Sequence, residues 1–420
     1  MRRNATNKDD RRVLRELGTI IRDIAADSIN GERKILWKRL NGLKCVRPLI
    51  FIFEIPWHEM EYENELTSLC HNSFLKEIEI KMRRTIYQWR HMQGDMVIEG
   101  FVASPLAISD TGIGLSENVV TSKTDERSDI VSRHFNIQIR TEENLEKIKK
   151  PVVRHNEEES ERNFQLLSDI FDGLLPVRKE GVKYTSVAPW DELVRLTGVN
   201  EILTDMAVRP NYVHKVISRM TDAYLSHLKQ CEQLNLLALN NDNTYLGGGL
   251  QYTDELPQKD FNPRHVRPLD MWGRTMSQIF SAVSPAMHDE FALQYELKYL
   301  GQFGLTYYGC CEPLHKKIGI LRQIPNLRKI SMSPWVNTEE GADEIGQDYV
   351  YSMKPNPAFL ASNIWKPELV RKNLEENLKK TRDCITEVIL KDISTVCYQP
   401  QRLWEWSRIA AEIVAGYGHS

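Results

Sequence analysis

The stretch GLTYYGCCEPLHKKIGIL, residues 304–321, contains the pattern that decides the fold. Residues 305–310 are a short apolar run that predicts a buried strand, and Pro313 opens a helix-compatible stretch directly after it. A strand followed at once by a helix is the repeating unit of parallel α/β proteins, because parallel strands need a crossover connection. We therefore expect further copies of this unit on both sides of it.

Working outward from this unit, eight short apolar runs alternate with longer helical patterns along the chain. They lie at residues 49–54, 96–104, 182–187, 234–240, 279–284, 305–310, 329–333 and 349–353. Near-continuous apolar strands between helices are typical of a sheet that is buried on both faces. Eight such units predict an α/β fold of the (β/α)8 TIM-barrel class, and a doubly wound open sheet is the alternative.

Proline marks the ends of the predicted strands. It cannot continue a parallel ladder, but it suits the first turn of a helix. Ser284 and Ser333 stand directly before two of these prolines, so they are interpreted as helix N-caps. In a barrel, all such junctions share the face at the carboxyl ends of the strands, where active sites lie. The six prolines are Pro56, Pro105, Pro285, Pro313, Pro334 and Pro355.

Two segments stand outside this repeating pattern. Leu14, Leu17 and Ile21 recur at helical spacing, so residues 1–45 predict an N-terminal helical extension. Residues from about 110 to 165 are charged and are interpreted as an insertion after the second strand. The barrel then spans residues 46–420, and these additions explain a length well above the roughly 250 residues of a minimal barrel.

The composition excludes several classes of protein. The chain has 420 residues and 48.8 kDa, and its 55 Lys+Arg and 58 Asp+Glu leave a net charge of −3, which argues against a nucleic-acid backbone as partner. No apolar run approaches the roughly 18 residues that cross a bilayer, and the first residues lack an apolar signal core. The seven cysteines are an odd number in a long chain, which predicts free thiols. We expect a cytoplasmic protein with no nucleic-acid or membrane partner.

The sharpest candidate site is the cluster Cys310-Cys311-Glu312 with His315. It ends a predicted strand and opens a predicted helix, whose N-terminal N–H groups favour thiolate character. Thiolate, imidazole and carboxylate are ligands of zinc, so these four residues are candidate metal ligands. The alternative is that both thiols are buried packing groups.

Four further residues are candidate catalytic groups. Glu54 and His58 follow the first apolar run, and His288 follows the fifth. Asp254 lies in the loop after the triple glycine at residues 247–249. Carboxylates and imidazoles are suited to general acid–base catalysis, and the alternative is that they are solvated loop or surface residues.

Five residues near predicted strand ends are candidate substrate contacts. Trp57 would provide an aromatic wall, and Lys354 would hold a substrate carboxylate. Asn240 and Tyr252 flank the glycine-rich loop, where the alternative is ordinary turn chemistry. Ser333 is a candidate contact besides its interpretation as an N-cap.

The second half of the chain resembles the uroporphyrinogen decarboxylase superfamily, which includes porphyrinogen decarboxylases and cobamide-dependent methyltransferases. The matching stretches are VSPAMHDEF (283–291), GLTYYGCCEPLHKKI (304–318), PNLRKISMSPW (325–335) and YVYSMKPNPAFL (349–360). PWDELVRLTG (189–198), followed by Arg209-Pro210, is similar to the middle helices of the family. The resemblance covers about residues 45–400 and implies the same barrel.

The two branches of this superfamily differ in their signatures. The arginine-rich signature of true uroporphyrinogen decarboxylases is missing here, since only Arg47 precedes the first strand, and several guanidinium groups would be needed to bind a multi-carboxylate tetrapyrrole. The methyltransferase branch binds zinc through a His-x-Cys and a later Cys. Here Tyr308-Gly309-Cys310 and Met353 stand at those places.

The resemblance thus implies a methyltransferase- or demethylase-like enzyme that moves a methyl group between a small substrate and a corrinoid. The corrinoid would be supplied by a partner protein, a zinc-type metal would act as Lewis acid or organise a thiolate, and the chain would form a homodimer. One alternative is a decarboxylase of a small acid without metal. Another is a non-catalytic barrel that binds a corrinoid or tetrapyrrole.

Overall fold

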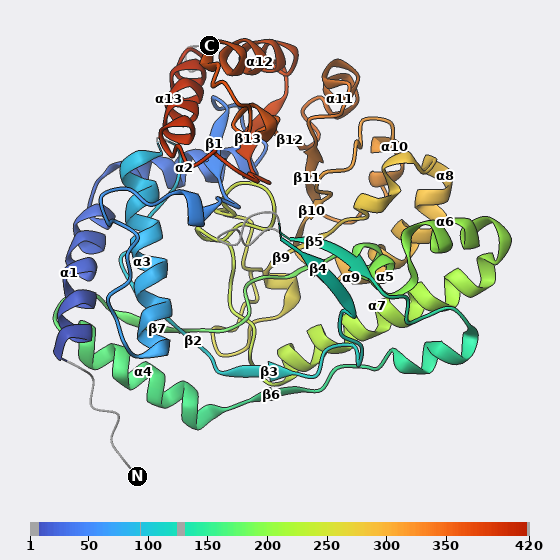
Figure 1. Ribbon diagram of the computed structural model, residues 1–420, viewed down its shortest axis with the longest axis horizontal. Helices are drawn as coiled ribbons and strands as arrows, with labels where there is room; N and C mark the ends of the chain where they lie inside the picture. The colour runs from blue at the N-terminus through green and yellow to red at the C-terminus, as the bar shows by residue number, and fades with distance from the viewer. Residues whose placement is uncertain (1–7, 93, 124–130, 418–420) are drawn as a thin grey trace.

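The computed structural model describes residues 8–92, 94–123 and 131–417, and at its centre lies one parallel sheet (Figure 1). The sheet has the order β1-β13-β12-β11-β10-β9-β8, with β1 and β8 at its two edges, so an α/β fold with a parallel central sheet is confirmed. Strand pairing among the described residues does not close this sheet into a complete barrel. The strands are β1 (Leu49–Ile52), β8 (Ser186–Val187), β9 (Trp272–Thr275), β10 (Leu305–Tyr308), β11 (Leu327–Met332), β12 (Val350–Met353) and β13 (Ile385–Leu390).

Side chains alternate between two different environments along the strands. On β11, Ile330 and Met332 pack into the apolar layer beneath the outer helices, whereas Lys329 and Ser331 point to the opposite face. The register pairs Ser331 with Ser352 of β12, and it pairs Ser352 with Glu387 of β13. A row of polar side chains therefore crosses the inner face of the sheet, although every residue of β12 and β13 is buried.

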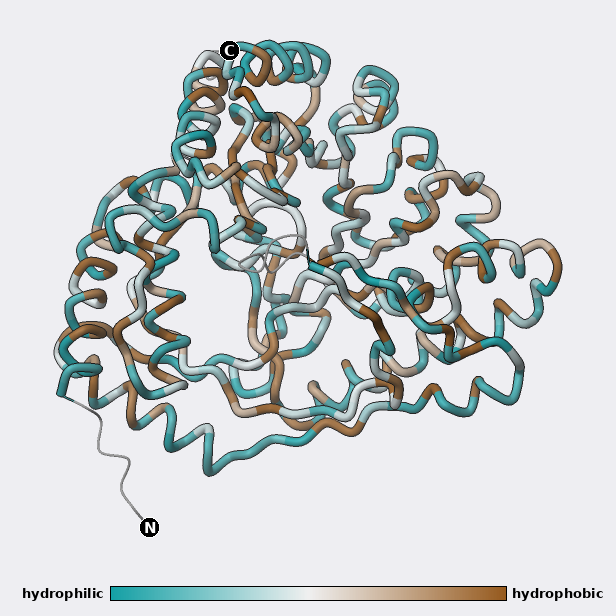
Figure 2. Tube along the Cα trace, in the orientation of Figure 1, coloured by the Kyte–Doolittle hydropathy of each residue, from teal (hydrophilic) through white to brown (hydrophobic). Residues whose placement is uncertain are grey.

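Helices cover the outer face because each of the last four strands is followed by one. Figure 2 shows apolar stretches along the strands and polar stretches on the outer helices. This arrangement confirms the predicted strand–helix repeat for the second half of the chain. The four helices are α10 (Ile318–Leu321), α11 (Thr338–Ile345), α12 (Pro367–Lys380) and α13 (Gln401–Ala415).

Four predicted strands, at 49–54, 305–310, 329–333 and 349–353, correspond to β1, β10, β11 and β12. The predicted strand at 279–284 is wrong, because this segment forms the 3-10 helix η4 (Gln278–Ala282) and the strand lies earlier, at β9. The run at 234–240 forms only an isolated parallel bridge between Leu237 and Val182. The strand β13 was not predicted, because Thr386 and Glu387 interrupt its apolar pattern.

The second and third predicted strands have different outcomes. The run at 96–104 yields β2 (Val102–Pro105), which pairs in parallel with β7 (Val177–Glu180) in a separate two-stranded sheet. The run at 182–187 ends in β8, which pairs with β9. The first half of the fold is thus less regular than the predicted repeat.

One of the two predicted N-caps is confirmed. Ser284 caps α8 (Pro285–His288), where its side chain accepts a hydrogen bond from the Met287 N–H. Ser333 is not an N-cap, because α11 begins at Thr338 with Asn337 as its cap. Ser333 instead lies buried at the end of β11.

The N-terminal segment packs closely against the rest of the protein. Helix α1 (Lys8–Ala25) lies on α3 (Ser73–His91) and α4 (Glu157–Phe171), and Gly18 lets the Phe171 ring approach its backbone. Helix α2 (Ile29–Asn41) buries Trp37 completely, and the Trp37 indole donates to the Asp95 carbonyl. The extension therefore contributes to the core, as its apolar stripe requires.

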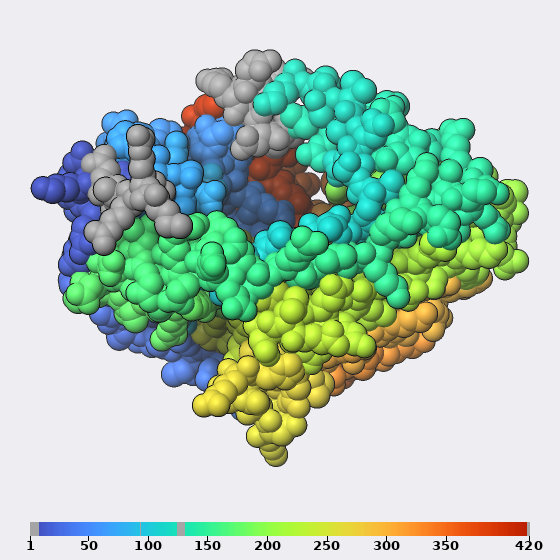
Figure 3. Space-filling model, turned by 90° about the horizontal axis from the view of Figure 1, so that it is seen from below, coloured from blue at the N-terminus to red at the C-terminus, as the bar shows by residue number. Residues whose placement is uncertain are grey.

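The segment predicted as an insertion folds into small antiparallel pairs. Strands β3 (Ile108–Asp110) and β6 (Val153–His155) pair, as do β4 (Val119–Ser122) and β5 (Ser132–Phe135), and residues 124–130 lie outside the described residues. Figure 3 shows that the face seen from below is hollowed between this teal segment and green α4, with red C-terminal residues visible in its depth. The remaining helical segments are η1 (Trp57–Glu59), η2 (Glu142–Lys147), α5 (Pro189–Thr197), α6 (Val199–Val208), α7 (Pro210–Gln233), η3 (Pro268–Asp270), the π-helix η5 (Asp289–Leu293), α9 (Gln294–Leu300) and η6 (Pro357–Phe359).

The segment at 241–256, which we name the interior loop, passes along the inner face of the sheet to the amino ends of the strands. A Cβ atom at Gly248 would meet Glu387 and Tyr307, and one at Gly249 would overlap the Trp37 ring, so only glycine permits this close approach. At its far end, Glu255 pairs with Arg328 at the start of β11.

Of the helices in the described part of the chain, none is long and apolar enough to cross a membrane.

Candidate functional site

The candidate site lies at the carboxyl ends of the strands, with Cys310 at its centre. Gly309, at φ +95°, turns the chain out of β10 and places Cys310 Sγ 3.0 Å from Lys391 Nζ, at the end of β13. Lys391 Nζ also lies 3.3 Å from Glu54 Oε2 and 3.1 Å from Asp392 Oδ2. We name these residues, with Cys311, Arg274 and Lys354, the mouth cluster.

The surroundings of Cys310 favour its thiolate. A hydrogen bond from the Cys311 thiol and the charges of Arg274 and Lys391 outweigh the effect of burial and lower the pKa of Cys310 to about 4. Cys311 Sγ lies 3.5 Å from Cys310 Sγ and 2.9 Å from Asp392 Oδ2, so both acceptors are within reach of its single S–H group. The same hydrogen bond to Cys310, together with burial, raises the pKa of Cys311, so one cysteine of the pair is a thiolate and the other a thiol.

The sequence predicted that a helix N-terminus would stabilise the thiolate. In the structure, side chains stabilise it instead. The next helix, α10, begins only at Ile318. Lys391 supplies the neutralising charge, and Arg274 holds the turn by donating from Nε and Nη2 to the Gly309 carbonyl at 3.1 and 2.9 Å. The position of Cys310 at a strand end therefore matters because β9 and β13 present cations there.

Three further charged groups lie on the inner face below Cys310. Lys354 donates to Ser352 Oγ at 2.7 Å, and burial, followed by the charges of Lys391 and Arg274, lowers the pKa of Lys354 to about 7, although Glu387 opposes this. Lys329 and Glu387 form an ion pair of 2.7 Å. Lys354 therefore exchanges its proton near neutral pH, as a proton donor to a substrate would need to.

Exposed aromatic and acidic side chains surround this buried centre. Tyr184 is 62% exposed and Tyr245 is 38% exposed, and the Tyr245 ring packs against Phe53 with a centroid distance of 4.7 Å. The side chains of Glu54 and Asp392 are 47% and 46% exposed. The mouth cluster thus lies directly beneath a solvent-accessible rim.

A second polar network lies behind β10, on the helix side. Glu312 accepts hydrogen bonds from the N–H groups of Cys310 at 2.8 Å and Ser277 at 3.3 Å. Ser277 in turn donates to Glu296, which also accepts from the Tyr308 hydroxyl at 2.7 Å. Tyr308 Oη lies 2.6 Å from His288 Nε2 and so ends the chain of contacts.

Burial dominates the protonation of this second network. It raises the pKa of Glu312 and of Glu296 to about 7, and for Glu312 the Cys310 charge adds to the effect. Burial and the neighbouring Lys317 lower the pKa of His288 to about 3, so this imidazole is neutral. His288 is therefore a fully buried structural group on the outer side of β10 and lies outside the mouth cluster.

The four predicted metal ligands do not converge. The carboxylate of Glu312 holds backbone N–H groups, and His315 lies toward Glu340, 3.8 Å away. In the described ranges, no group of three or more His, Cys, Asp and Glu side chains could hold a metal ion. Zinc needs four convergent donors, or three with one open position, so Cys310, Cys311, Glu312 and His315 do not fit a zinc site.

Two candidates after the first strand lie away from Cys310. The Trp57 ring packs edge-on against Tyr87 of α3, at 5.9 Å between centroids, and Arg84 lies over its other side. His58 Nε2 lies 3.6 Å from Glu59. Of the residues predicted at this strand end, only Glu54 reaches the mouth cluster.

Three candidates near the glycine-rich loop are also not at the mouth. Asn240 is buried and bonds the backbone of Trp272 and Lys183, which fixes the start of β9. The Tyr252 hydroxyl donates to Glu99. Asp254 is exposed and pairs with Lys38 of α2, at the amino ends of the strands, because the interior loop runs in that direction.

Lys354 and Ser333 lie at the ends of β12 and β11, as predicted, and both are buried. The mouth residues that the sequence did not reveal are Arg274, Lys391, Asp392 and Asp191 of α5, whose pKa is raised by burial first and then by the Cys310 charge. Arg274 lies in β9 and Lys391 directly follows β13, and each occupies a position whose side chain faces the inner side of the sheet. Polar residues at alternate positions of an otherwise apolar strand, as in residues 329–333 (KISMS), are the signal that could have identified them, and Glu387 and Lys391 stand four residues apart on the same face.

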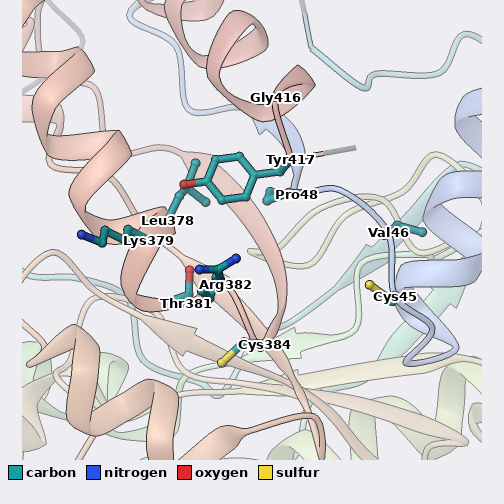
Figure 4. A pocket seen from close by; sticks show the side chains of 10 residues that line it. All are labelled: Cys45, Val46, Pro48, Leu378, Lys379, Thr381, Arg382, Cys384, Gly416 and Tyr417. Atoms are coloured by element: carbon teal, nitrogen blue, oxygen red, sulfur yellow. The ribbon is translucent and has the colours of Figure 1, made fainter. Parts of the chain in front are cut away.

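Two cavities lie outside the mouth cluster. One, of about 380 Å³, lies at the amino ends of β1 and β13 beside the C-terminal helix, with Arg382 beneath the Tyr417 ring (Figure 4). The other, of about 410 Å³, lies between α5, α7 and the first part of the insertion.

Comparison with known proteins gives little further information. No protein-family model matches the sequence, and no curated protein matches it. Among solved structures, a methyltransferase from Methanosarcina mazei is similar with a TM-score of 0.47 and 9% sequence identity, over 90% of this chain and 97% of that chain. At these values the function has to be argued from the residues of this chain.

Proposed function

We propose that this protein is a methyltransferase-like enzyme whose nucleophile is the Cys310 thiolate and whose substrate is a small anion. The observation that carries the proposal is the 3.0 Å contact between Cys310 Sγ and Lys391 Nζ at the carboxyl ends of the strands. A thiolate paired with a lysine is an activated nucleophile, and activation by a cation needs no metal.

The proposed step is a displacement at a methyl carbon. The Cys310 thiolate attacks, an S–C bond forms, and the bond from the methyl carbon to the substrate heteroatom breaks. The electron pair of that bond leaves with the heteroatom, which takes a proton from Lys354. Arg274 and Lys391 hold the anionic part of the substrate through charge-assisted hydrogen bonds.

The sequence resemblance extends this proposal to a partner. A corrinoid on a second protein would supply the carrier that exchanges the methyl group, and a homodimer would be the working form. The mouth residues that would face such a partner are the exposed ones, Glu54, Asp392, Tyr184 and Tyr245.

A second candidate function, decarboxylation of a small acid, is favoured by a separate observation. Arg274, Lys354 and Lys391 bring three buried or nearly buried cations to one place, and their charges act on one another. Such a cluster binds carboxylates whether or not a thiolate reacts. In this alternative, Cys310 would only balance the positive charge.

The test is to follow a labelled methyl group. The protein is incubated with methyl donors that carry a carboxylate and a carbon-13 methyl group, namely methoxyacetate, N-methylglycine and methylthioacetate, and with carbon-13 methylcobalamin. The peptide that contains Cys310 is then analysed by mass spectrometry. We expect label on Cys310, loss of label in Cys310→Ser, and at least a tenfold slower reaction in Lys391→Met, an order-of-magnitude value for a lost charge partner. Cys45→Ser, at an exposed cysteine before β1, is the matched control and should react normally.

Three other outcomes would decide against the proposal. Methyl transfer that persists in Cys310→Ser would exclude the thiolate as nucleophile. Release of carbon dioxide from small acids, lost in Arg274→Met and kept in Cys310→Ser, would establish the decarboxylase. Tight binding of methylcobalamin without turnover of any donor would indicate a carrier protein.

A further inference from the structure

The cavity of about 410 Å³ between α5, α7 and the insertion is lined by three tyrosines from different parts of the chain. Tyr184 comes from the segment before β8, Tyr224 from α7 and Tyr299 from α9. Aromatic faces attract organic cations, and each tyrosine also offers a hydroxyl group. Tyr224 and Tyr299 meet because α7 packs against α9, and α5 packs against α7 at the same cavity.

The charged side chains of this lining leave one carboxylate without an ion pair. Glu117 pairs with Arg195 at 2.6 Å, and Asp110 Oδ2 lies 3.6 Å from His227 Nε2. Glu192 forms no ion pair with any residue that the structure describes. Burial raises the pKa of Glu192, and the hydrogen bond with Tyr224 and the charge of Arg195 oppose this effect only in part, so a cation beside Glu192 would favour its ionised form.

Two hydroxyl groups of the same lining also bear on ligand binding. Ser186 Oγ is buried and makes no hydrogen bond within the described part of the chain, and the Tyr224 hydroxyl lies beside Glu192, with which it interacts. Buried hydroxyl groups in folded proteins nearly always have partners, so the lone Ser186 hydroxyl indicates a ligand with polar hydrogens. The lining therefore offers aromatic rings, a carboxylate without an ion pair and two hydroxyl groups.

We infer that this cavity binds a small methylated ammonium ion, with its charge at Glu192 and its methyl groups against the tyrosine rings. The volume suits an ion of this size with room for water. The inference is independent of the proposed function, because it concerns binding at residues that take no part in the Cys310 chemistry. Tyr184 lies between the two regions, because it lines this cavity and also acts electrostatically on Arg274.

The experiment is isothermal titration of the full-length protein with trimethylammonium and tetramethylammonium chloride. tert-Butanol is the neutral probe of similar shape. We expect saturable binding of the cations and at least about tenfold weaker binding of tert-butanol, the ratio that a desolvated cation–π contact provides. Glu192→Gln should weaken cation binding by a similar factor, and Tyr224→Phe should weaken trimethylammonium, which has an N–H donor, more than tetramethylammonium.

The control is Glu201→Gln, on the exposed surface of α6, which should bind as the wild type does. Equal affinity for tert-butanol and tetramethylammonium in the wild-type protein would overturn the inference, and so would unchanged affinity in Glu192→Gln. The wild-type comparison alone decides the question if a variant does not fold. Failure of both cations to bind leaves the Cys310 proposal untouched, because the label experiment is a separate measurement.

Discussion

Lys329 and Glu387 form an ion pair whose two side chains are 2% and 0% exposed, on the inner face of the sheet. Glu387 also accepts a hydrogen bond from Ser352, so its carboxylate is well satisfied. Taking charges out of water is costly, and a buried pair is therefore most vulnerable when a single partner is removed.

Removing one partner of this pair should destabilise the fold strongly. Lys329→Met and Glu387→Gln should each lower the free energy of unfolding by about 3–5 kcal/mol, because each leaves an uncompensated buried group. Urea unfolding followed by circular dichroism measures the change. The double variant should lose less free energy of unfolding than the two single variants lose together. Full additivity of the two losses would show that the pair is not coupled.

A matched exposed pair provides the control. Lys372 and Glu376 lie 3.9 Å apart on α12, with 71% and 60% of their side chains exposed. Lys372→Met should change the free energy of unfolding by no more than about 1 kcal/mol.

At the level of single residues, the sequence revealed what stands out in type or position. Cys310 and Cys311 were found because two adjacent cysteines at a strand end are conspicuous, and Glu54 because it ends an apolar run. Arg274 and Lys391 were not found, because their role depends on which strands are neighbours. His315 and Glu312 were assigned to a metal because their spacing was read without knowing that the chain turns at Gly309.

Strand β9 contains a glycine that is needed for its close packing. A Cβ atom at Gly273 would overlap the Phe303 ring, whereas a Cβ atom at Gly319 of α10 would meet nothing within 4 Å. Gly273→Ala should therefore lower the free energy of unfolding by about 1–3 kcal/mol through overpacking. Thermal unfolding of the two alanine variants measures the difference.

Gly319→Ala is the control for this substitution. It should be neutral or stabilising by up to about 1 kcal/mol, because alanine favours a helix more than glycine does. Equal destabilisation by both substitutions would mean that Phe303 does not limit the space at Gly273.

At the level of elements, the repeat of strand and helix could be predicted wherever the apolar runs were uninterrupted, as in β10, β11 and β12. β9 and β13 could not, because each carries a charged residue, Arg274 or Glu387, that faces inward and breaks the apolar pattern. The strands that present the cations Arg274 and Lys391 are thus the ones whose apolar pattern is interrupted.

In the whole molecule, two buried carboxylates join the N-terminal helix to the rest of the fold. Asp10 of α1 accepts from the N–H groups of His71 and Asn72, and Glu79 of α3 accepts from those of Leu69 and Cys70. The loop before α3 is therefore held from both sides by carboxylates. Its anchoring by Glu79 depends on that carboxyl being ionised.

Because of this arrangement, part of the free energy of unfolding depends on pH in the acidic range. Burial alone would raise the pKa of Glu79, but hydrogen bonds from Ser68, Cys70, Leu69 and Arg83 lower it to about 2, from 4.5. A carboxyl whose pKa is lower in the folded state stabilises above pH 4.5, and this contribution is lost as pH falls toward 2. Glu79→Gln should therefore lower the free energy of unfolding by about 3 kcal/mol at pH 7. The difference in this free energy between the variant and wild type should shrink between pH 4.5 and 2.

Denaturant unfolding at a series of pH values measures this difference. Glu376→Gln, at an exposed carboxylate of α12, should show no such convergence. A constant difference between Glu79→Gln and wild type across the range would contradict the argument.

The interior loop has a consequence for the order of events in any reaction at the mouth. Its glycines lie against Tyr307, Glu387 and Trp37, so the space under the reacting atoms is occupied by the protein's own backbone. Small molecules would then reach the mouth cluster past its exposed rim of Tyr184, Tyr245, Glu54 and Asp392. A product that leaves and a partner that binds would occupy the same rim. We therefore expect product release to precede partner binding.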